Sequence, residues 1–241
     1  MPETSPLVGL LDAAAVLSLE HQLHLEDVLG DDLEWEVSLD EPRFEFFGRH
    51  PIVCDRVHLL GLAAPGPGVW QWVWANPQSD SRFPKALTEL ARSLREVGER
   101  DAIAELAMPE VAFAALPGSP TEPAVAANIL VKAAKVLTGR WTSYVNTYDG
   151  GTRFAYLLEH PDLQLPPPNW AGTRRAVQMA LAGTPMNDQR LALRTYAELR
   201  QVEWHSPEPS RALLAGPDFR AVFHFDQDHR VTRVEAESGS E

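Results

Sequence analysis

The stretch "GVWQWVWANPQ", residues 68–78, contains Trp70, Trp72 and Trp74 at every second position and ends in Asn76-Pro77. Successive side chains of a β-strand point to opposite faces, so this spacing predicts a strand with three indole rings on one face. Each ring can bury about 150–250 Å², and three bare rings would form a larger apolar patch than a typical monomer exposes. Either the core of the protein or a binding partner therefore has to cover them.

The flanking sequence predicts further strands joined by short turns. Residues 33–48 alternate apolar and polar side chains around a turn at Glu41-Pro42, and residues 52–64 read as another strand. Pro65 to Gly68 then turn the chain into the tryptophan strand. Turns this short cannot connect parallel strands, so we expect an antiparallel meander.

Helical periodicity predicts the remaining elements. The first helix spans residues 7–29, the second starts at Pro84, the third starts near Thr121, and their expected ends are at Gly30, Gly98 and Gly139. The third helix is expected to bury Val125, Ile129, Ala133, Val136 and Leu137. Two further helices are predicted at about 169–183 and 186–200, the latter capped by Thr184. The C-terminal strands form a hairpin around Asp226 to His229.

These elements predict an α+β fold, in which helices pack on one face of antiparallel sheet segments. We expect a single unit over residues 1–241. Pro109, Pro117 and Pro120 mark the best candidate for an internal boundary, which would give two similar halves, 1–117 and 118–241. A shift of 84 residues lays the tryptophan strand on Phe154, Tyr156 and Leu158. Duplication and independent use of the same strand-to-helix turn both explain this pattern.

Composition limits the classes of function. The formal net charge of −13 and the lack of a basic stripe argue against binding to nucleic acid. Cys54 is the only cysteine, which excludes an intrachain disulfide and a multi-cysteine zinc site. The N-terminal sequence lacks the basic region of a secretory signal, and Asp12 and Glu20 interrupt its apolar stretch. We therefore expect a cytoplasmic protein with no membrane partner.

No motif nominates a catalytic residue, a cofactor or a metal. The nucleophile elbow, the phosphate-binding loops and the zinc-protease motif are all absent. Cys54 is interpreted as a small buried side chain. His21 and His24 are interpreted as part of a polar helical stripe, because the sequence nominates no further metal ligands for them. Glu34 and Glu36 are interpreted as a solvated strand face. The acidic and histidine residues at 224–229 are interpreted as a turn.

The three tryptophans remain the only candidate ligand-binding residues. The helix that starts at Pro84 follows them at once and carries a leucine-rich stripe that can cover them, which favours a core role. The other interpretation is that Trp70, Trp72 and Trp74 line a pocket or a partner surface.

The order of "VHLLGLAAPGPGVWQWVWANPQ", "LREVGERDAIAEL", "HPDLQLPPP", "DQRLALRTYAELR" and "FDQDHRVTRVEAE" resembles a bacterial family of domains of unknown function. The W-x-W-x-W-A-N strand carries the resemblance, which implies one intact unit and no activity. We therefore expect a non-enzymatic protein that binds a protein or a small molecule. The alternative is an enzyme that acts on a small molecule through acid and base residues scattered along the sequence.

Overall fold

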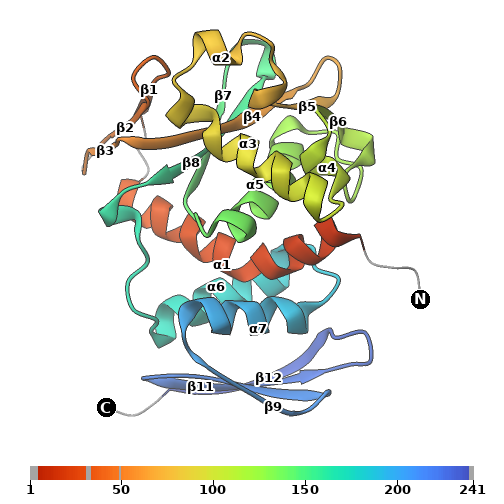
Figure 1. The fold of residues 1–241 in the computed structure, drawn as a ribbon. Coiled ribbons are helices and arrows are strands. Elements are labelled where there is room, and N and C mark those ends of the chain that lie inside the picture. Colours follow the sequence, from red (N-terminus) through yellow and green to blue (C-terminus); the bar gives the residue numbers. More distant parts are fainter. Residues whose placement is uncertain (1–4, 31–33, 49, 239–241) are drawn as a thin grey trace. The chain divides into compact units, whose positions relative to one another are not determined.

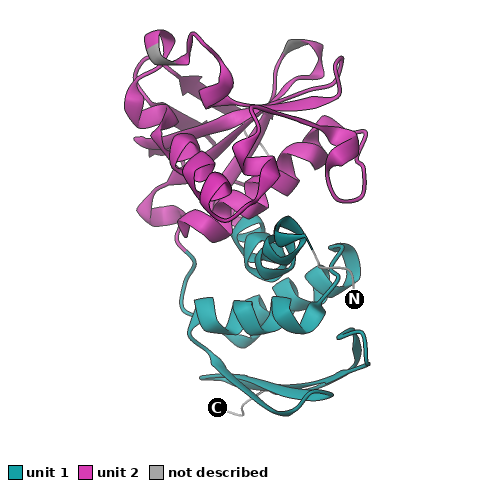
Figure 2. Ribbon diagram, turned by 45° about the vertical axis from the view of Figure 1, so that its right-hand side comes forward, with its two compact units in different colours: residues 1–24, 165–241 teal, residues 25–164 magenta. Residues whose placement is uncertain are grey.

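The structure is a computed structural model that describes residues 5–30, 34–48 and 50–238. The chain is α+β and divides into two compact units (Figure 2). The central unit comprises residues 25–164, and the terminal unit comprises residues 1–24 together with 165–241. The boundary at 24/25 falls inside helix α1 (Pro6–Leu29). These units do not coincide with the halves 1–117 and 118–241, whose similarity stays a prediction.

A five-stranded antiparallel sheet forms the centre of the central unit (Figure 1), with strand order β6-β5-β4-β8-β7. Its strands are β4 (Arg56–Ala64), β5 (Val69–Trp72), β6 (Glu110–Ala112), β7 (Ser143–Thr147) and β8 (Arg153–Glu159). Two hairpins, β4–β5 and β7–β8, are joined through the β4–β8 pair. The predicted antiparallel pairing is therefore confirmed, and β4 is the middle strand. The expected single meander is wrong, because residues 34–54 pair in a separate three-stranded sheet and β8 lies on the other side of β4.

A second, three-stranded antiparallel sheet belongs to the same unit. It consists of β1 (Glu34–Ser38), β2 (Arg43–Phe47) and β3 (Ile52–Cys54). Phe44 of β2 is fully buried, and its ring centroid lies 5.3 Å from that of Tyr144 and 5.4 Å from that of Tyr156. Aromatic side chains thus join the small sheet to β7 and β8.

Two long helices, α3 (Lys85–Arg100) and α5 (Pro123–Thr138), pack against the five-stranded sheet. The shorter helical segments are α2 (Ser79–Arg82), α4 (Ala104–Ala107) and the 3-10 turns η1 (Val73–Ala75), η2 (Phe113–Ala115), η3 (Asp149–Gly151) and η4 (Pro161–Leu163). The predicted ends at Gly30 and Gly139 are confirmed, since both glycines have positive φ angles of 75° and 66°.

Three expectations for this unit are wrong. Helix α3 continues past Gly98, where a Cβ atom would lie 2.7 Å from the Cβ of Leu106, so the glycine allows α4 to approach instead of ending the helix. Val125 is 50% exposed, because α5 buries the face formed by Ala126, Ala127, Leu130 and Val131. The stretch with three prolines contains β6, a strand of the sheet, so it is no boundary between units.

The terminal unit stacks helices on a four-stranded antiparallel sheet (Figure 1) with the order β12-β11-β10-β9. Its elements are α6 (Trp170–Gly183), α7 (Gln189–Arg200), β9 (Glu203–Glu208), β10 (Arg211–Gly216), β11 (Phe219–Phe225) and β12 (Val231–Ser238). The predicted β11–β12 hairpin is confirmed. Strands β9 and β12 are the two edges of this sheet.

The first part of α1 is tied to this unit by a buried ion pair. Arg200 Nε lies 3.0 Å from Glu20 Oε2, and the two side chains are only 11% and 10% exposed. Burial raises the pKa of Glu20, and the charge of Arg200 opposes that rise. Within the described residues, no helix is both long enough and apolar enough to cross a membrane.

Candidate functional site

Trp70 and Trp72 belong to the core of the central unit. Both are 0% exposed, and their rings meet edge to face with centroids 5.3 Å apart. The indole nitrogen of Trp72 donates a hydrogen bond of 2.9 Å to the carbonyl oxygen of Glu105. Gly61 on the neighbouring strand makes room for Trp70, because a Cβ atom there would lie 2.7 Å from its ring. This burial supports the core interpretation for these two residues.

Trp74 does not share their face, contrary to the strict alternation expected from sequence. Strand β5 ends at Trp72, and residues 73–75 form a 3-10 turn closed by a bond of 3.3 Å from the Asn76 N–H to the Val73 carbonyl. The turn buries Val73 instead of continuing the alternation. The guanidinium carbon of Arg95 lies 4.7 Å from the centre of the Trp74 ring and partly covers it.

The other residues considered from sequence form no reactive cluster. Cys54 is fully buried, and burial raises the pKa of its thiol to about 12, so it stays protonated. Glu34 and Glu36 are exposed, as a solvated strand face predicts. Among the described residues, no group of three or more His, Cys, Asp or Glu could hold a metal ion, so His21 and His24 gain no further ligands there.

One histidine cluster in the central unit was not expected. Glu159 Oε1 lies 2.9 Å from both His58 Nε2 and Arg140 Nε. Burial lowers the pKa of His58, although its bond to Glu159 opposes this shift. The ring's Nδ1 atom is buried and has no hydrogen-bond partner in the described part of the chain. A substrate could not reach that atom, so we assign the cluster to the connection between β4, β8 and the end of α5.

The terminal unit contains an open cleft of about 660 Å³ between α7 and the edge strand β9, which we name the α7–β9 cleft. Its lining residues are Asp188, Arg190, Leu191, Arg194, Glu198, Val202, Trp204, Ser206 and His229. The lining combines charged side chains with the apolar groups of Leu191, Val202 and Trp204. Such a combination is typical of sites that bind and orient a ligand.

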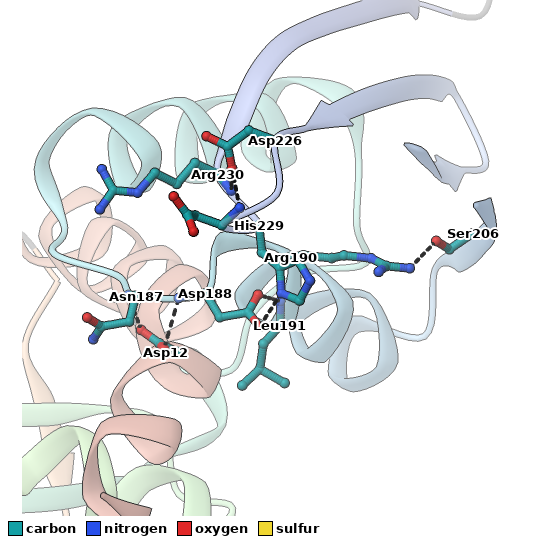
Figure 3. A network of polar contacts seen from close by, with 10 residues as sticks. Asp12, Asn187, Asp188, Arg190, Leu191, Ser206, Asp226, His229 and Arg230 are labelled. Carbon is teal, nitrogen blue, oxygen red and sulfur yellow. Dashed lines mark hydrogen bonds and ion pairs between the residues drawn. The ribbon is translucent and has the colours of Figure 1, made fainter. Parts of the chain in front are cut away.

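Polar contacts fix the N-terminus of α7 at one end of the cleft (Figure 3). The Asp12 carboxylate accepts hydrogen bonds from the backbone N–H groups of Asn187 at 2.8 Å and Asp188 at 3.1 Å. The Asp188 carboxylate in turn accepts a bond of 2.7 Å from the N–H of Leu191 and caps the helix. The predicted cap at Thr184 is therefore wrong: Thr184 closes α6, and α7 begins five residues later.

His229 lies at the same end of the cleft. It occupies the β11–β12 turn with a φ angle of 58°, and its Nδ1 atom is 2.8 Å from Asp188 Oδ2. Asp226 stabilises this turn by accepting bonds from the N–H groups of Asp228 and Arg230. The interpretation as a turn is confirmed for residues 226–229, whereas His224 belongs to strand β11. The turn also brings an oriented imidazole to the cleft.

Arg190 spans the cleft from α7 to β9 (Figure 3). One of its terminal nitrogens donates a hydrogen bond of 2.6 Å to Ser206 Oγ. The other acidic and basic side chains of the lining contact each other in pairs, since Arg194 Nε lies 2.8 Å from Glu198 Oε1 and His229 Nδ1 lies 2.8 Å from Asp188 Oδ2. Arg190 forms no ion pair with any residue that the structure describes. The cleft therefore contains one guanidinium whose partner is a neutral hydroxyl.

A smaller apolar pocket lies between α6 and the four-stranded sheet. It has a volume of about 90 Å³ and is lined mainly by apolar side chains, among them Val177, Leu214, Phe223 and Val234. It holds few polar groups that could orient a ligand, so the α7–β9 cleft is the stronger candidate site.

The comparisons with known proteins place the chain in a family. A family model described as "Family of unknown function (DUF6882)" matches residues 8–161, which is more than half of the chain. The chain belongs to the DUF6882 family. No curated protein and no solved structure matches it. The DUF6882 match includes the tryptophan core and ends before α6, so the α7–β9 cleft lies outside the matched segment.

Proposed function

We propose that this member of DUF6882 is a non-enzymatic binding protein, and that the α7–β9 cleft binds a ligand through an anionic group at Arg190. The observation that carries the proposal is the guanidinium of Arg190, which lines an open cleft and has only the Ser206 hydroxyl as its partner. A carboxylate or phosphate would give the guanidinium an ionised acceptor, with which arginine forms paired, bidentate hydrogen bonds that a single hydroxyl cannot offer.

The surroundings of Arg190 are ready for such a ligand. Asp12 and Asp188 hold the N-terminus of its helix in place. Binding therefore costs little conformational entropy in this part of the protein. Leu191 and Trp204 offer an apolar surface beside the charge. Ser206 Oγ is engaged by Arg190 and lies 3.1–3.2 Å from the carbonyl oxygens of Arg211 and Glu208, so its partners include no general base.

Ligand binding can be tested by thermal unfolding in the presence of defined anions. We expect acetate, citrate or inorganic phosphate at millimolar concentration to raise the Tm of the wild type and not that of Arg190→Gln. Arg220→Gln, on an exposed position of β11, is the matched control for loss of one positive charge and should respond as the wild type does. Equal responses of the wild type and Arg190→Gln would contradict the proposal.

A second candidate function is an enzyme that acts on a small molecule. The Asp188–His229 contact favours it, because a carboxylate at Nδ1 orients the ring and leaves Nε2 as a proton acceptor. Turnover of a bound ligand that is lost in His229→Asn, with binding retained, would support the enzyme over the binding protein.

We also place the protein in the cytoplasm, with neither nucleic acid nor membrane as a partner. The net charge of −13 supports the absence of these two partners, because phosphate-rich surfaces would repel the chain.

A further inference from the structure

We propose that the ligand of the α7–β9 cleft is an extended peptide segment, which adds to the outer edge of β9 as an antiparallel strand and places an acidic side chain at Arg190. The inference rests on the proposed function and specifies its partner.

Strand β9 lies at one edge of the four-stranded sheet. Among the described strands β9 pairs with β10 alone, so its other edge is open. An open edge presents backbone N–H and C=O groups to which a peptide strand can hydrogen-bond. Pro207 has no N–H, which limits the usable edge to residues 203–206. Apart from the pairing with β10, the backbone of that segment makes no hydrogen bond to the described residues.

Helix α7 lies beside this edge and offers a surface to the side chains of an added strand. Val202, Trp204 and Ser206 are two residues apart and all line the cleft, as the period of a strand requires. Arg190, Leu191 and Arg194 line it from α7. The cleft therefore offers backbone pairing along β9 and side-chain contacts with α7. Proteins that bind extended peptides by strand addition have this arrangement.

The charged and apolar groups of the lining follow a fixed order along the cleft. The guanidinium of Arg190 lies at Ser206, whereas apolar surface lies at Trp204 and Val202. Side chains directly opposite each other on neighbouring strands are about 4.5–5.5 Å apart at Cβ. An antiparallel peptide would thus meet Arg190 first and the apolar positions two and four residues later. The recognised pattern is acidic-x-apolar-x-apolar, read from the N-terminus.

A titration with the peptide Ac-Glu-Thr-Leu-Thr-Val-amide, followed by NMR of the ¹⁵N-labelled full chain, tests the inference. We expect shifts of the Trp204 indole signal and of the β9 amides, and slower hydrogen exchange of those amides on binding. The same peptide with Gln in place of Glu, and the rearranged peptide Ac-Glu-Leu-Thr-Val-Thr-amide, should bind on the order of tenfold more weakly.

Variants of the protein connect the binding to the cleft. Arg190→Gln should weaken binding of the Glu peptide on the order of tenfold and should not distinguish the Glu peptide from the Gln peptide. Arg190→Lys, which keeps the charge, should retain part of that preference. Arg220→Gln should bind as the wild type does. Thermal melts of all three variants verify that they are folded.

The outcomes separate this inference from the proposed function. If acetate or phosphate binds at Arg190 and the peptide binds no better than acetate, the peptide inference is wrong and the anion site stands. If the Glu peptide and the rearranged peptide bind equally, the predicted strand pairing is overturned. If neither anions nor peptides bind, both proposals fail.

Discussion

Trp72 combines complete burial with a hydrogen bond from its indole nitrogen to the Glu105 carbonyl. Replacing Trp72 with Ala should lower the free energy of unfolding by about 3–5 kcal/mol, because it leaves a cavity and an unsatisfied carbonyl. Urea unfolding measures the loss. Trp204→Ala is the matched control, since this side chain is only partly buried and its removal should cost much less. Similar losses in the two variants would contradict the core role of Trp72.

Lys135 is a buried base on α5. Burial and, to a smaller extent, the charge of Lys132 together lower the pKa of its ammonium group to about 7. Between pH 10 and pH 7 the Lys135 side chain is protonated in the unfolded chain and neutral in the folded chain. The free energy of unfolding should therefore fall by about 1.4 kcal/mol for each unit that the pH decreases in this range, and the fall should stop below pH 7.

The variant Lys135→Met lacks this titration. We expect its stability advantage over the wild type to grow as the pH decreases from 9 to 7 and to stay constant below that. Urea unfolding at several pH values measures the difference. Parallel pH profiles of the two proteins would show that the folded-state pKa of Lys135 is not lowered.

At the scale of single elements, α7 depends on two carboxylates at its N-terminus. Asp12→Ala removes the acceptor of two backbone N–H groups and should cost about 1.5–3 kcal/mol, the usual value for hydrogen bonds to a charged group. Asp188→Ala removes the helix cap and should cost about 1 kcal/mol. Urea unfolding gives both values. Hydrogen exchange should accelerate at the first amides of α7 in both variants, and unchanged exchange there would contradict this account.

The sequence correctly predicted those elements whose start or end depends on residues that are close together in the chain. The end of α1 at Gly30, the end of α5 at Gly139 and the β11–β12 hairpin are of this kind, and the structure confirms them. The start of α7 could not be predicted in this way. Thr184-Pro185 is a good local signal, but Asp12, 176 residues from Asp188 in sequence, stabilises the later start.

The α7–β9 cleft escaped prediction for the same reason. Its residues lie in three separate segments, 188–198, 202–206 and the turn at His229, and each segment alone has a plain structural interpretation. These segments come together only because β9 pairs with β10 and because β12 pairs with β11 after the turn at His229. The tryptophan stretch behaves in the opposite way: its residues are adjacent in sequence, so its strand and its burial could be inferred for Trp70 and Trp72.

For the whole molecule, the discontinuous terminal unit is the feature with the clearest consequence. Residues 165–241 contain α6, α7 and the four-stranded sheet, but the unit also includes residues 1–24. Those residues supply Asp12 to the N-terminus of α7 and Glu20 to Arg200. A fragment of residues 165–241 would hold a buried guanidinium without its carboxylate, and removal of one partner of a buried ion pair costs about 3–5 kcal/mol.

We therefore expect the fragment 165–241 to be largely unfolded, with a weak helical signal in circular dichroism. Adding a synthetic peptide of residues 1–24 should restore the helical signal, because the peptide supplies both carboxylates. The same peptide with Asp12→Ala and Glu20→Ala is the matched control and should restore much less. Cooperative thermal unfolding of the fragment alone would show that residues 165–241 do not need the N-terminal segment, and equal rescue by the two peptides would show that apolar contacts of α1, not its carboxylates, complete the unit.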